Sequence, residues 1–144
     1  MLDLRRIDDR ISVAPQIAPA DVAAIKAAGF TTVINNRPDG EEPGQPTGDA
    51  IAGACADGGL AYHAIPVTHA GFTHDQVTQT IELLGAADGP VLAYCRSGTR
   101  SCHLWALAQA GLGEAPDVVI EAAAGAGYDI SGARPLLDAL SPKG

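Results

Sequence analysis

The sequence is poor in aromatic residues, in positive charge and in long apolar runs. Aromatic residues make up 4% of its 144 residues, and nine lysines and arginines stand against seventeen aspartates and glutamates, for a net charge of −8. This acidic balance argues against a nucleic-acid surface, which needs clustered basic residues. No apolar run could span a bilayer, and residues 1–10 lack the apolar segment of a secretory signal. We therefore expect a cytoplasmic protein with no nucleic-acid and no membrane partner.

Cysteine is also scarce. The three cysteines, at positions 55, 95 and 102, are an odd number and form no disulfide framework. A reduced, intracellular protein with one working thiol is the simplest interpretation. The four histidines show no metal-ligand spacing, so we expect neither a metal nor another cofactor.

Short apolar runs alternate with helical segments along the chain. We expect strands at 4–7, 11–13, 30–34, 60–67 and 90–94, and helices at 19–28, 49–56, 73–84, 102–110, 116–124 and 135–140. The first two strands should pair antiparallel. The alternation predicts one α/β domain over residues 1–144, with a central, mostly parallel sheet of about four to five strands flanked by helices. Ligands bind such sheets at the carboxyl ends of the strands, where the loops after residues 34, 67 and 94 should meet.

The run Tyr94–Ser101 is the most informative stretch, because it joins a buried strand to a helix. Such a loop can point its N–H groups inward, and the helix adds the positive end of its dipole. A free cysteine titrates near ~8.5, and helix N-termini and arginines can pull that value below neutrality. We therefore predict that Cys95 is a thiolate nucleophile at the floor of an anion-binding loop.

Neighbouring residues complete this predicted site. Arg100 can donate two parallel hydrogen bonds to a bound oxyanion, and Arg96 carries a second positive charge. Gly98 permits a backbone conformation that a side chain would block. The hydroxyl groups available to the thiolate or the anion belong to Ser97, Thr99 and Ser101. The Tyr94 hydroxyl either lines the site as well or belongs to an aromatic ring that packs at the strand end.

The long polar loop from residue 35 to 48 should reach the same strand ends. Arg37 could bind the donor anion there, or the loop could be a solvated polar segment. Its carboxylates, which could position an acceptor or an arginine, are Asp39, Glu41 and Glu42. His69, on the next loop, could bind anions or move protons. Cys102, inside the following helix, is either a resolving thiol or a small buried residue.

On these residues the chain resembles the β-lactamase-hydrolase-like protein family (DUF442). The resemblance runs from about residue 11 to residue 110, and its segments are Ser12–Gln16, Gly29–Glu42, Ile65–Val67 and, most specifically, Pro90–Ser101. It implies a protein-tyrosine-phosphatase-like fold. Members have been called both phosphatases and sulfurtransferases, so the resemblance leaves the reaction open. Some relatives are fused to a persulfide dioxygenase, which the resemblance therefore suggests as a partner.

Two features favour sulfur over phosphorus. Four residues separate Cys95 from Arg100, as in rhodanese-type sulfurtransferases, whereas the phosphatase signature has five. A tighter ring of N–H donors suits one sulfur atom better than a tetrahedral phosphoryl group. A phosphatase also needs a general acid for its leaving group, and residues 68–71 contain no carboxylate where phosphatases of this fold usually carry an aspartate. A carboxylate from elsewhere in the chain could take its place, and the candidates are Asp39, Glu41, Glu42 and Asp75. Sulfite or a thiolate leaves unaided.

We therefore expect a sulfurtransferase. Cys95 would take a sulfane sulfur from thiosulfate or glutathione persulfide and pass it to a thiol acceptor such as glutathione, while Arg100 and Arg96 steer the anionic donor. The alternative is a cysteine-dependent phosphatase, acting on a protein or a small phosphomonoester through a phosphocysteine. A further alternative is a non-catalytic module that binds an anion or a partner's carboxylate.

Overall fold

The computed structural model describes residues 2–141, and a five-stranded sheet forms its centre. The strand order is β1-β2-β5-β3-β4. β1 (Arg5–Arg6) pairs antiparallel with β2 (Ile11–Ala14), and β2 runs parallel to β5 (Val91–Tyr94). β5 and β4 (Ala61–Ala64) both run parallel to β3 (Thr32–Asn35), which lies between them. The predicted mostly parallel sheet is confirmed.

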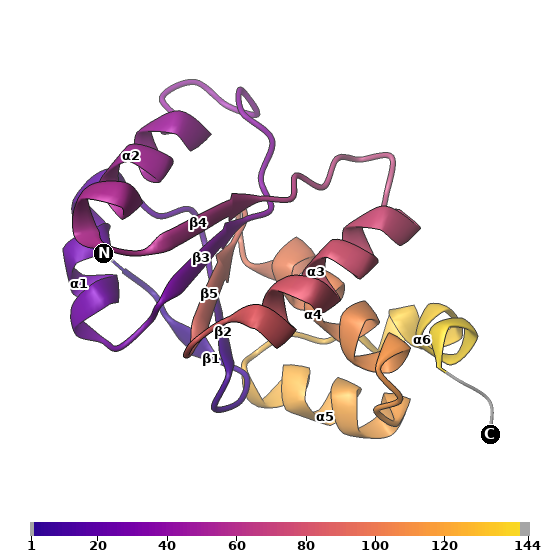
Figure 1. Ribbon diagram of the computed structural model, residues 1–144. Helices are drawn as coiled ribbons and strands as arrows, with labels where there is room; N and C mark the ends of the chain where they lie inside the picture. Colours follow the sequence, from indigo (N-terminus) through magenta and orange to yellow (C-terminus); the bar gives the residue numbers. More distant parts are fainter. Residues whose placement is uncertain (1, 142–144) are drawn as a thin grey trace.

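Helices cover both faces of this sheet (Figure 1). One face carries α1 (Val22–Ala27) and α2 (Gly48–Gly58); the other carries α3 (His74–Ala86), α4 (Thr99–Gly111), α5 (Pro116–Gly125) and α6 (Arg134–Leu140). Two short 3₁₀ turns, Pro19–Asp21 and Ser131–Ala133, precede α1 and α6. Within residues 2–141, no helix has both the length and the apolar character needed to cross a membrane.

Side-chain alternation along β5 creates the two-sided core. Val91 and Ala93 belong to the hydrophobic cluster shared with α3, α4, α5 and α6. Leu92 and Tyr94 belong to the cluster under α1 and α2, because successive residues of a strand point to opposite faces. All four side chains are therefore buried, and the strand reads as an uninterrupted apolar run in the sequence.

Two element boundaries differ from the sequence prediction in ways that matter for the site. α4 begins at Thr99 rather than at residue 102, so Arg100 lies in the first helical turn instead of the loop. β4 ends at Ala64, although the amides of Ile65 and Val67 still donate to the carbonyls of Asn35 and Asn36. The Val67 amide donates to Asn36 rather than to Arg37, so the register shifts by one residue around Pro66, whose missing N–H would have faced the open edge of the sheet.

Candidate active site

Cys95 directly follows β5, and its side chain is completely buried. Its Sγ accepts a hydrogen bond from the backbone N–H of Gly98 at 3.1 Å. Gly98 adopts a left-handed conformation with φ 91° and forms the N-cap of α4. The loop therefore turns back, so that one of its amides faces the sulfur at the positive end of a helix. This is the strand–loop–helix arrangement that the sequence predicts.

The backbone at Gly98 leaves no room for a side chain. A Cβ atom there would lie 2.1 Å from the hydroxyl oxygen of Tyr128, in addition to the strain of a positive φ. The same Tyr128 hydroxyl donates a hydrogen bond to the Ser97 carbonyl at 3.0 Å. On the other side, the Cys95 amide donates to the Ala14 carbonyl of β2 at 3.4 Å. The loop is thus held from both sides by parts of the chain far from it in sequence.

Arg100 makes the predicted two-point contact, but its partner is a carboxylate of the protein. Its Nη1 and Nη2 donate to the two oxygens of Glu41 at 2.8 and 2.7 Å, and Nη1 also donates to the Val67 carbonyl at 2.7 Å. Hydrogen bonds from Arg100, and then from Arg37, lower the pKa of Glu41 to about 2. Glu41 is therefore an anion throughout the neutral range.

Arg37 does not face a donor anion, and the prediction that it binds one is wrong. Its side chain is 1% exposed. Each nitrogen of its guanidinium has a protein acceptor: Nε donates to Glu41 at 2.8 Å, Nη2 to Glu42 at 2.9 Å and Nη1 to Gln16 at 3.1 Å. Arg37 instead fixes the two carboxylates of its own loop.

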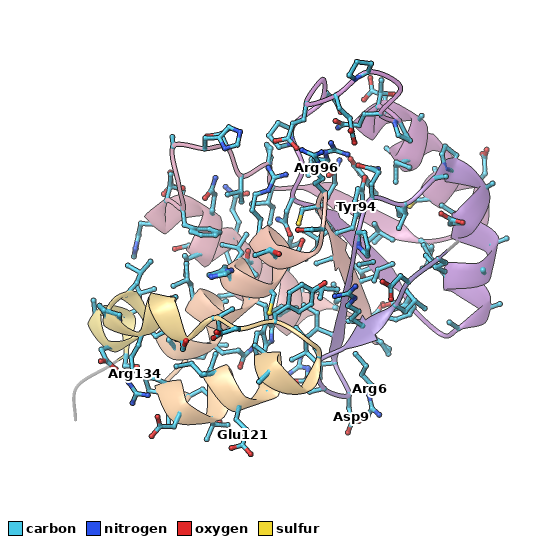
Figure 2. The ribbon with its side chains drawn as sticks, turned by 180° about the vertical axis from the view of Figure 1, so that it is seen from behind. Arg6, Asp9, Tyr94, Arg96, Glu121 and Arg134 are labelled. Carbon is cyan, nitrogen blue, oxygen red and sulfur yellow. The ribbon has the colours of Figure 1, made fainter. Side chains whose placement is uncertain are left out.

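An open pocket of about 260 Å³ lies over the cysteine loop. The residues that line it are Glu41, His69, Arg96, Ser97, Thr99 and Arg100. They come from the loops after β3, β4 and β5 and from the first turn of α4, which confirms that these loops converge. The Arg96 side chain is 67% exposed, and its contact with Glu42 is a long 3.9 Å, so its guanidinium can meet an incoming anion (Figure 2).

Hydroxyl groups divide between the pocket and the interior. The Ser97 hydroxyl donates to Thr99 Oγ1 at 2.9 Å, and both residues line the pocket as predicted. Ser101 is buried, and its hydroxyl donates to Asn36 Oδ1 at 2.8 Å. Ser101 therefore joins the first turn of α4 to the end of β3, and the prediction that it contacts the anion is wrong.

Tyr94 and Asp39 lie outside the pocket, contrary to their prediction as site residues. The Tyr94 ring is 1% exposed in the cluster under α1 and α2, and burial raises the pKa of its hydroxyl. Among the residues described, none hydrogen-bonds that hydroxyl. Asp39 accepts a hydrogen bond from the Gly48 amide at 2.8 Å, so it closes the loop at the start of α2. The packing interpretation of Tyr94 is the correct one.

The other two thiols differ from Cys95 in their surroundings. Cys55 and Cys102 are buried, and the three cysteines of the described chain are all free. Burial raises the pKa of Cys102 to about 12 and also raises that of Cys55. A thiol that stays protonated to such a pH is a poor nucleophile, which supports a packing role for Cys102 rather than a resolving one.

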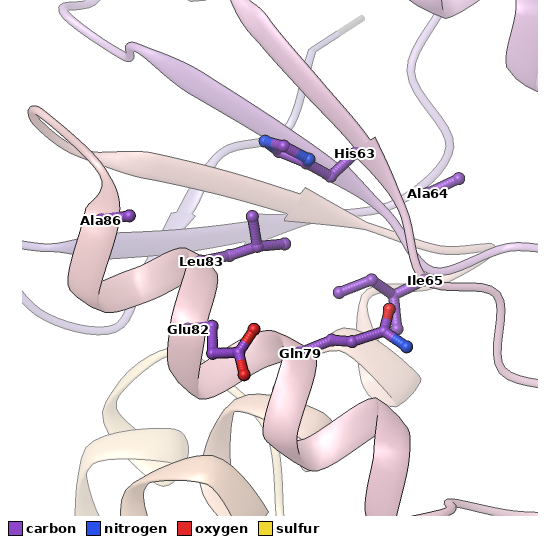
Figure 3. A pocket seen from close by; sticks show the side chains of 7 residues that line it. All are labelled: His63, Ala64, Ile65, Gln79, Glu82, Leu83 and Ala86. Atoms are coloured by element: carbon purple, nitrogen blue, oxygen red, sulfur yellow. The ribbon is translucent and has the colours of Figure 1, made fainter.

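A second cavity, of about 320 Å³, lies between β4 and α3, away from the cysteine loop (Figure 3). Its lining consists of His63, Ala64, Ile65, Gln79, Glu82, Leu83 and Ala86. It contains no cysteine and no arginine, so neither nucleophile nor cation of the predicted chemistry lies there. Over residues 2–141, no group of three or more histidine, cysteine, aspartate or glutamate side chains is arranged to hold a metal ion.

Three supporting residues escaped the sequence analysis: Gln16, Asn36 and Tyr128. Gln16 and Asn36 lie inside segments that carry the family resemblance, but nothing local shows which partner each would contact. Tyr128 follows the turn at residues 126–127 after α5. The one local signal was an aromatic residue after a glycine turn in a chain with few aromatic residues.

Comparisons with known proteins identify the family to which the chain is similar. Residues 3–112 match the family model "Beta-lactamase hydrolase-like protein, phosphatase-like domain". The beta-lactamase hydrolase-like protein of Agrobacterium fabrum (strain C58) is 39% identical over 105 residues, which are 73% of this chain and 24% of that protein. A protein of the same name from Xylella fastidiosa (strain Temecula1) is 35% identical over 103 residues, 72% of this chain and 24% of the relative. The match thus spans about a quarter of each relative's length.

Solved structures agree with this assignment. A Neisseria meningitidis protein, named a candidate phosphatase, has a TM-score of 0.82 at 36% identity, covering 94% of this chain and 96% of that one. A Shewanella putrefaciens DUF442 protein, also named a candidate phosphatase, has a TM-score of 0.68 at 20% identity, covering 95% and 85%. Kinase-associated phosphatase has a TM-score of 0.71 at 16% identity, covering 97% and 95%. The last two share the fold alone. The protein-tyrosine-phosphatase-like fold is confirmed, and the chain belongs to the phosphatase-like domain family of the beta-lactamase hydrolase-like proteins.

Proposed function

We propose that this chain is an enzyme that transfers a small group in two steps, through a covalent bond to Cys95. Three observations support this proposal. Cys95 directly follows β5 beside a helix N-terminus, a backbone N–H already donates to its sulfur, and a pocket with exposed Arg96 lies over the loop. Such catalysis needs a nucleophile, a hydrogen-bond donor that stabilises negative charge and a cation that attracts the anionic substrate.

Family membership supports a phosphoryl group, and this makes a phosphatase a serious candidate. In that reaction the Cys95 thiolate attacks phosphorus, and the ester oxygen leaves with the electron pair of the broken P–O bond. That oxygen must receive a proton from a general acid, and water then hydrolyses the phosphocysteine. The printed names of the relatives support this candidate more than they support sulfur transfer.

One observation in the pocket favours sulfur transfer, namely that its carboxylate is ionised. Among the described lining residues, Glu41 is the one that carries a carboxylate. This carboxylate accepts hydrogen bonds from both Arg37 and Arg100. With a pKa of about 2, Glu41 has no proton to give to a leaving alkoxide at neutral pH. Among the lining residues, His69 is then the side chain that could protonate a leaving alkoxide. The pocket lining does not include the other candidate carboxylates, which are those of Asp39, Glu42 and Asp75.

Sulfur transfer needs no such acid. The Cys95 thiolate attacks the outer sulfur of thiosulfate, the S–S bond of the donor breaks, and its electron pair leaves with sulfite. A second thiolate, such as that of glutathione, then attacks the outer sulfur of the Cys95 persulfide. It leaves as a new persulfide and returns Cys95 to the thiolate. We therefore favour sulfane-sulfur transfer, with phosphomonoester hydrolysis as the second candidate.

The other residues take supporting roles in this scheme. Arg96 attracts the anionic donor, and the hydroxyls of Ser97 and Thr99 offer it hydrogen bonds at the pocket wall. Arg100 and Glu41 hold the wall in place rather than binding the donor directly. A persulfide dioxygenase, which consumes the product of a transfer to glutathione, is the partner that we propose from the family resemblance.

Turnover measurements with two donors test the proposal. We expect the wild-type chain and Cys102→Ser to release sulfite from thiosulfate in the presence of glutathione or cyanide, and Cys95→Ser to release none. Hydrolysis of p-nitrophenyl phosphate should be much slower. Rapid phosphate release without sulfite release would select the phosphatase instead. If Cys95→Ser bound thiosulfate as the wild type does and neither protein turned over any donor, the chain would be a binding module.

A further inference from the structure

We propose that Tyr128 is a positioning residue for the nucleophile. Its hydroxyl fixes the orientation of the peptide bond between Ser97 and Gly98, and that peptide supplies the N–H that Cys95 Sγ accepts. The inference rests on the proposed role of Cys95 as the nucleophile, but it does not depend on which group Cys95 carries. It assigns a task to the helical tail, which lies outside the residues matched by the family model.

The geometry of one peptide bond carries the argument. A trans peptide points its C=O and its N–H in opposite directions, and no cis peptide occurs in the described chain. On one side, the Ser97 carbonyl accepts a hydrogen bond from Tyr128 at 3.0 Å. On the other side, the Gly98 N–H donates to Sγ at 3.1 Å. Holding the carbonyl toward Tyr128 therefore holds the N–H toward the sulfur.

Gly98 makes such a restraint necessary. Because glycine accepts both signs of φ, the peptide that precedes it can rotate at low cost. A rotated peptide would turn the Ser97 carbonyl oxygen toward Sγ, and a negative dipole end beside the sulfur opposes a thiolate. A side chain at position 98 cannot prevent this rotation, because Tyr128 occupies the space that a Cβ would need. The Tyr128 hydroxyl can prevent it.

Tyr128 is itself firmly held. Its amide donates to the Ala123 carbonyl at the end of α5, and Gly127 before it has φ 96°. The ring is 6% exposed in the cluster shared with α3–α6, and the guanidinium carbon of Arg5 lies 5.2 Å from the ring centroid. The hydroxyl therefore has a fixed platform made from both ends of the described chain.

The matched pair Tyr128→Phe and Tyr94→Phe tests this inference. Each variant keeps a buried ring and loses one hydroxyl, but the Tyr94 hydroxyl has no hydrogen-bond partner among the described residues. The readout is the pH titration of Cys95, followed by the ultraviolet absorbance of its thiolate after subtraction of the same variant carrying Cys95→Ser. No substrate is needed, so failure of this inference and failure of the proposed function are distinguishable.

We expect Tyr128→Phe to move the midpoint of the Cys95 titration upward and to lower kcat about three- to tenfold at neutral pH, which is the worth of one ordinary hydrogen bond. KM for thiosulfate should change little, and the thermal unfolding midpoint should stay within a few degrees. Tyr94→Phe should leave the titration unchanged. An unshifted titration in Tyr128→Phe, or an equal shift in Tyr94→Phe, would overturn the inference. If Tyr128→Phe did not fold, Tyr128→Trp, which keeps a donor on a buried ring, would have to restore both folding and the wild-type midpoint; a folded Trp variant with a raised midpoint also counts against it.

Discussion

The cysteine loop (residues 95–98) and the carboxylate loop (residues 36–47) meet at the same edge of the sheet, but different forces order them. The cysteine loop uses its own backbone, because the Gly98 N–H donates to Cys95 Sγ where α4 begins. The carboxylate loop is ordered by ion pairs, in which Arg37 and Arg100 share Glu41. Arg100 lies 59 residues from Glu41 in sequence. A local backbone hydrogen bond can be predicted from adjacent residues. An ion pair between distant residues cannot, because the fold brings its partners together.

Breaking the cysteine loop should have the largest effect. In Gly98→Ala, the new Cβ would meet the Tyr128 hydroxyl and the backbone would keep a positive φ, so the loop must move. Because displacing a reacting group by about 1 Å can cost ~100-fold in rate, we expect a fall in kcat of about that size. Steady-state sulfite release measures it.

Gly53→Ala is the matched control for this variant. Gly53 lies within α2, and a Cβ there would meet no atom within 4 Å. Alanine is favoured over glycine in a helix by about 1 kcal/mol, so this variant should keep full activity and unfold at a slightly higher temperature. Equal activity in the two variants would show that the left-handed turn at Gly98 does not matter for catalysis.

Removing the central carboxylate of the carboxylate loop should mainly lower the free energy of unfolding. Glu41→Gln removes the carboxylate that Arg37, which is almost completely buried, and Arg100 share. The folded pKa of Glu41 is about 2, below the 4.5 of an unperturbed glutamate. This difference corresponds to about 3 kcal/mol of unfolding free energy. Because the folded pKa is the lower one, this stabilisation is complete above about pH 5 and is lost as the pH falls toward 2.

Urea unfolding at several pH values checks this prediction. The free energies of unfolding of the wild type and Glu41→Gln should differ by about 3 kcal/mol at pH 7, and the difference should disappear as the pH approaches 2. Glu42→Gln is the control, since the Glu42 side chain is 44% exposed and solvent screens its ion pairs, so this variant should unfold almost as the wild type does. A difference in unfolding free energy between the wild type and Glu41→Gln that does not change with pH would contradict the ion-pair account.

The smallest effect is expected at the pocket rim. Arg96→Ala removes an exposed cation and should raise KM for thiosulfate about threefold with little change in kcat, because a screened surface charge mainly attracts the donor. Added salt should reduce the difference. Arg134→Ala, at the far end of the molecule from Arg96, should change neither constant (Figure 2). A loss of kcat in Arg96→Ala would place this guanidinium on the reacting atoms instead.

These comparisons also explain what the sequence could predict. The parallel sheet, the position of Cys95 and the helix after it follow from contiguous patterns of apolar residues, glycine and helix caps, and all are confirmed. Convergence of the loops after β3, β4 and β5 follows from the topology, because parallel strands end at one edge. The pocket residues His69 and Arg96 could therefore be named in advance.

The failures share a cause: they depend on which way a side chain points in three dimensions. Tyr94 faces the cluster under α1 and α2 because of its strand parity, although Cys95 is its neighbour. Arg37 turns inward because Glu41, Glu42 and Gln16 together satisfy its guanidinium, which no local pattern indicates. The contact between Tyr128 and Ser97 spans 31 residues and joins the tail to the loop.

The mass of the Cys95 peptide after incubation with thiosulfate tests the central claim most directly. If Cys95 carries sulfane sulfur, this peptide should gain one sulfur atom, glutathione should remove it, and the peptide bearing Cys102 should gain none. Trypsin, by cleaving after Arg96 and Arg100, separates Cys95 from Cys102. Because the peptide that ends at Arg96 also contains Cys55, the measurement uses Cys55→Ser, in which Cys95 is the one thiol of that peptide. A Cys95 peptide of unchanged mass, from a protein that rapidly hydrolyses p-nitrophenyl phosphate, would contradict sulfur transfer and establish the phosphatase in its place.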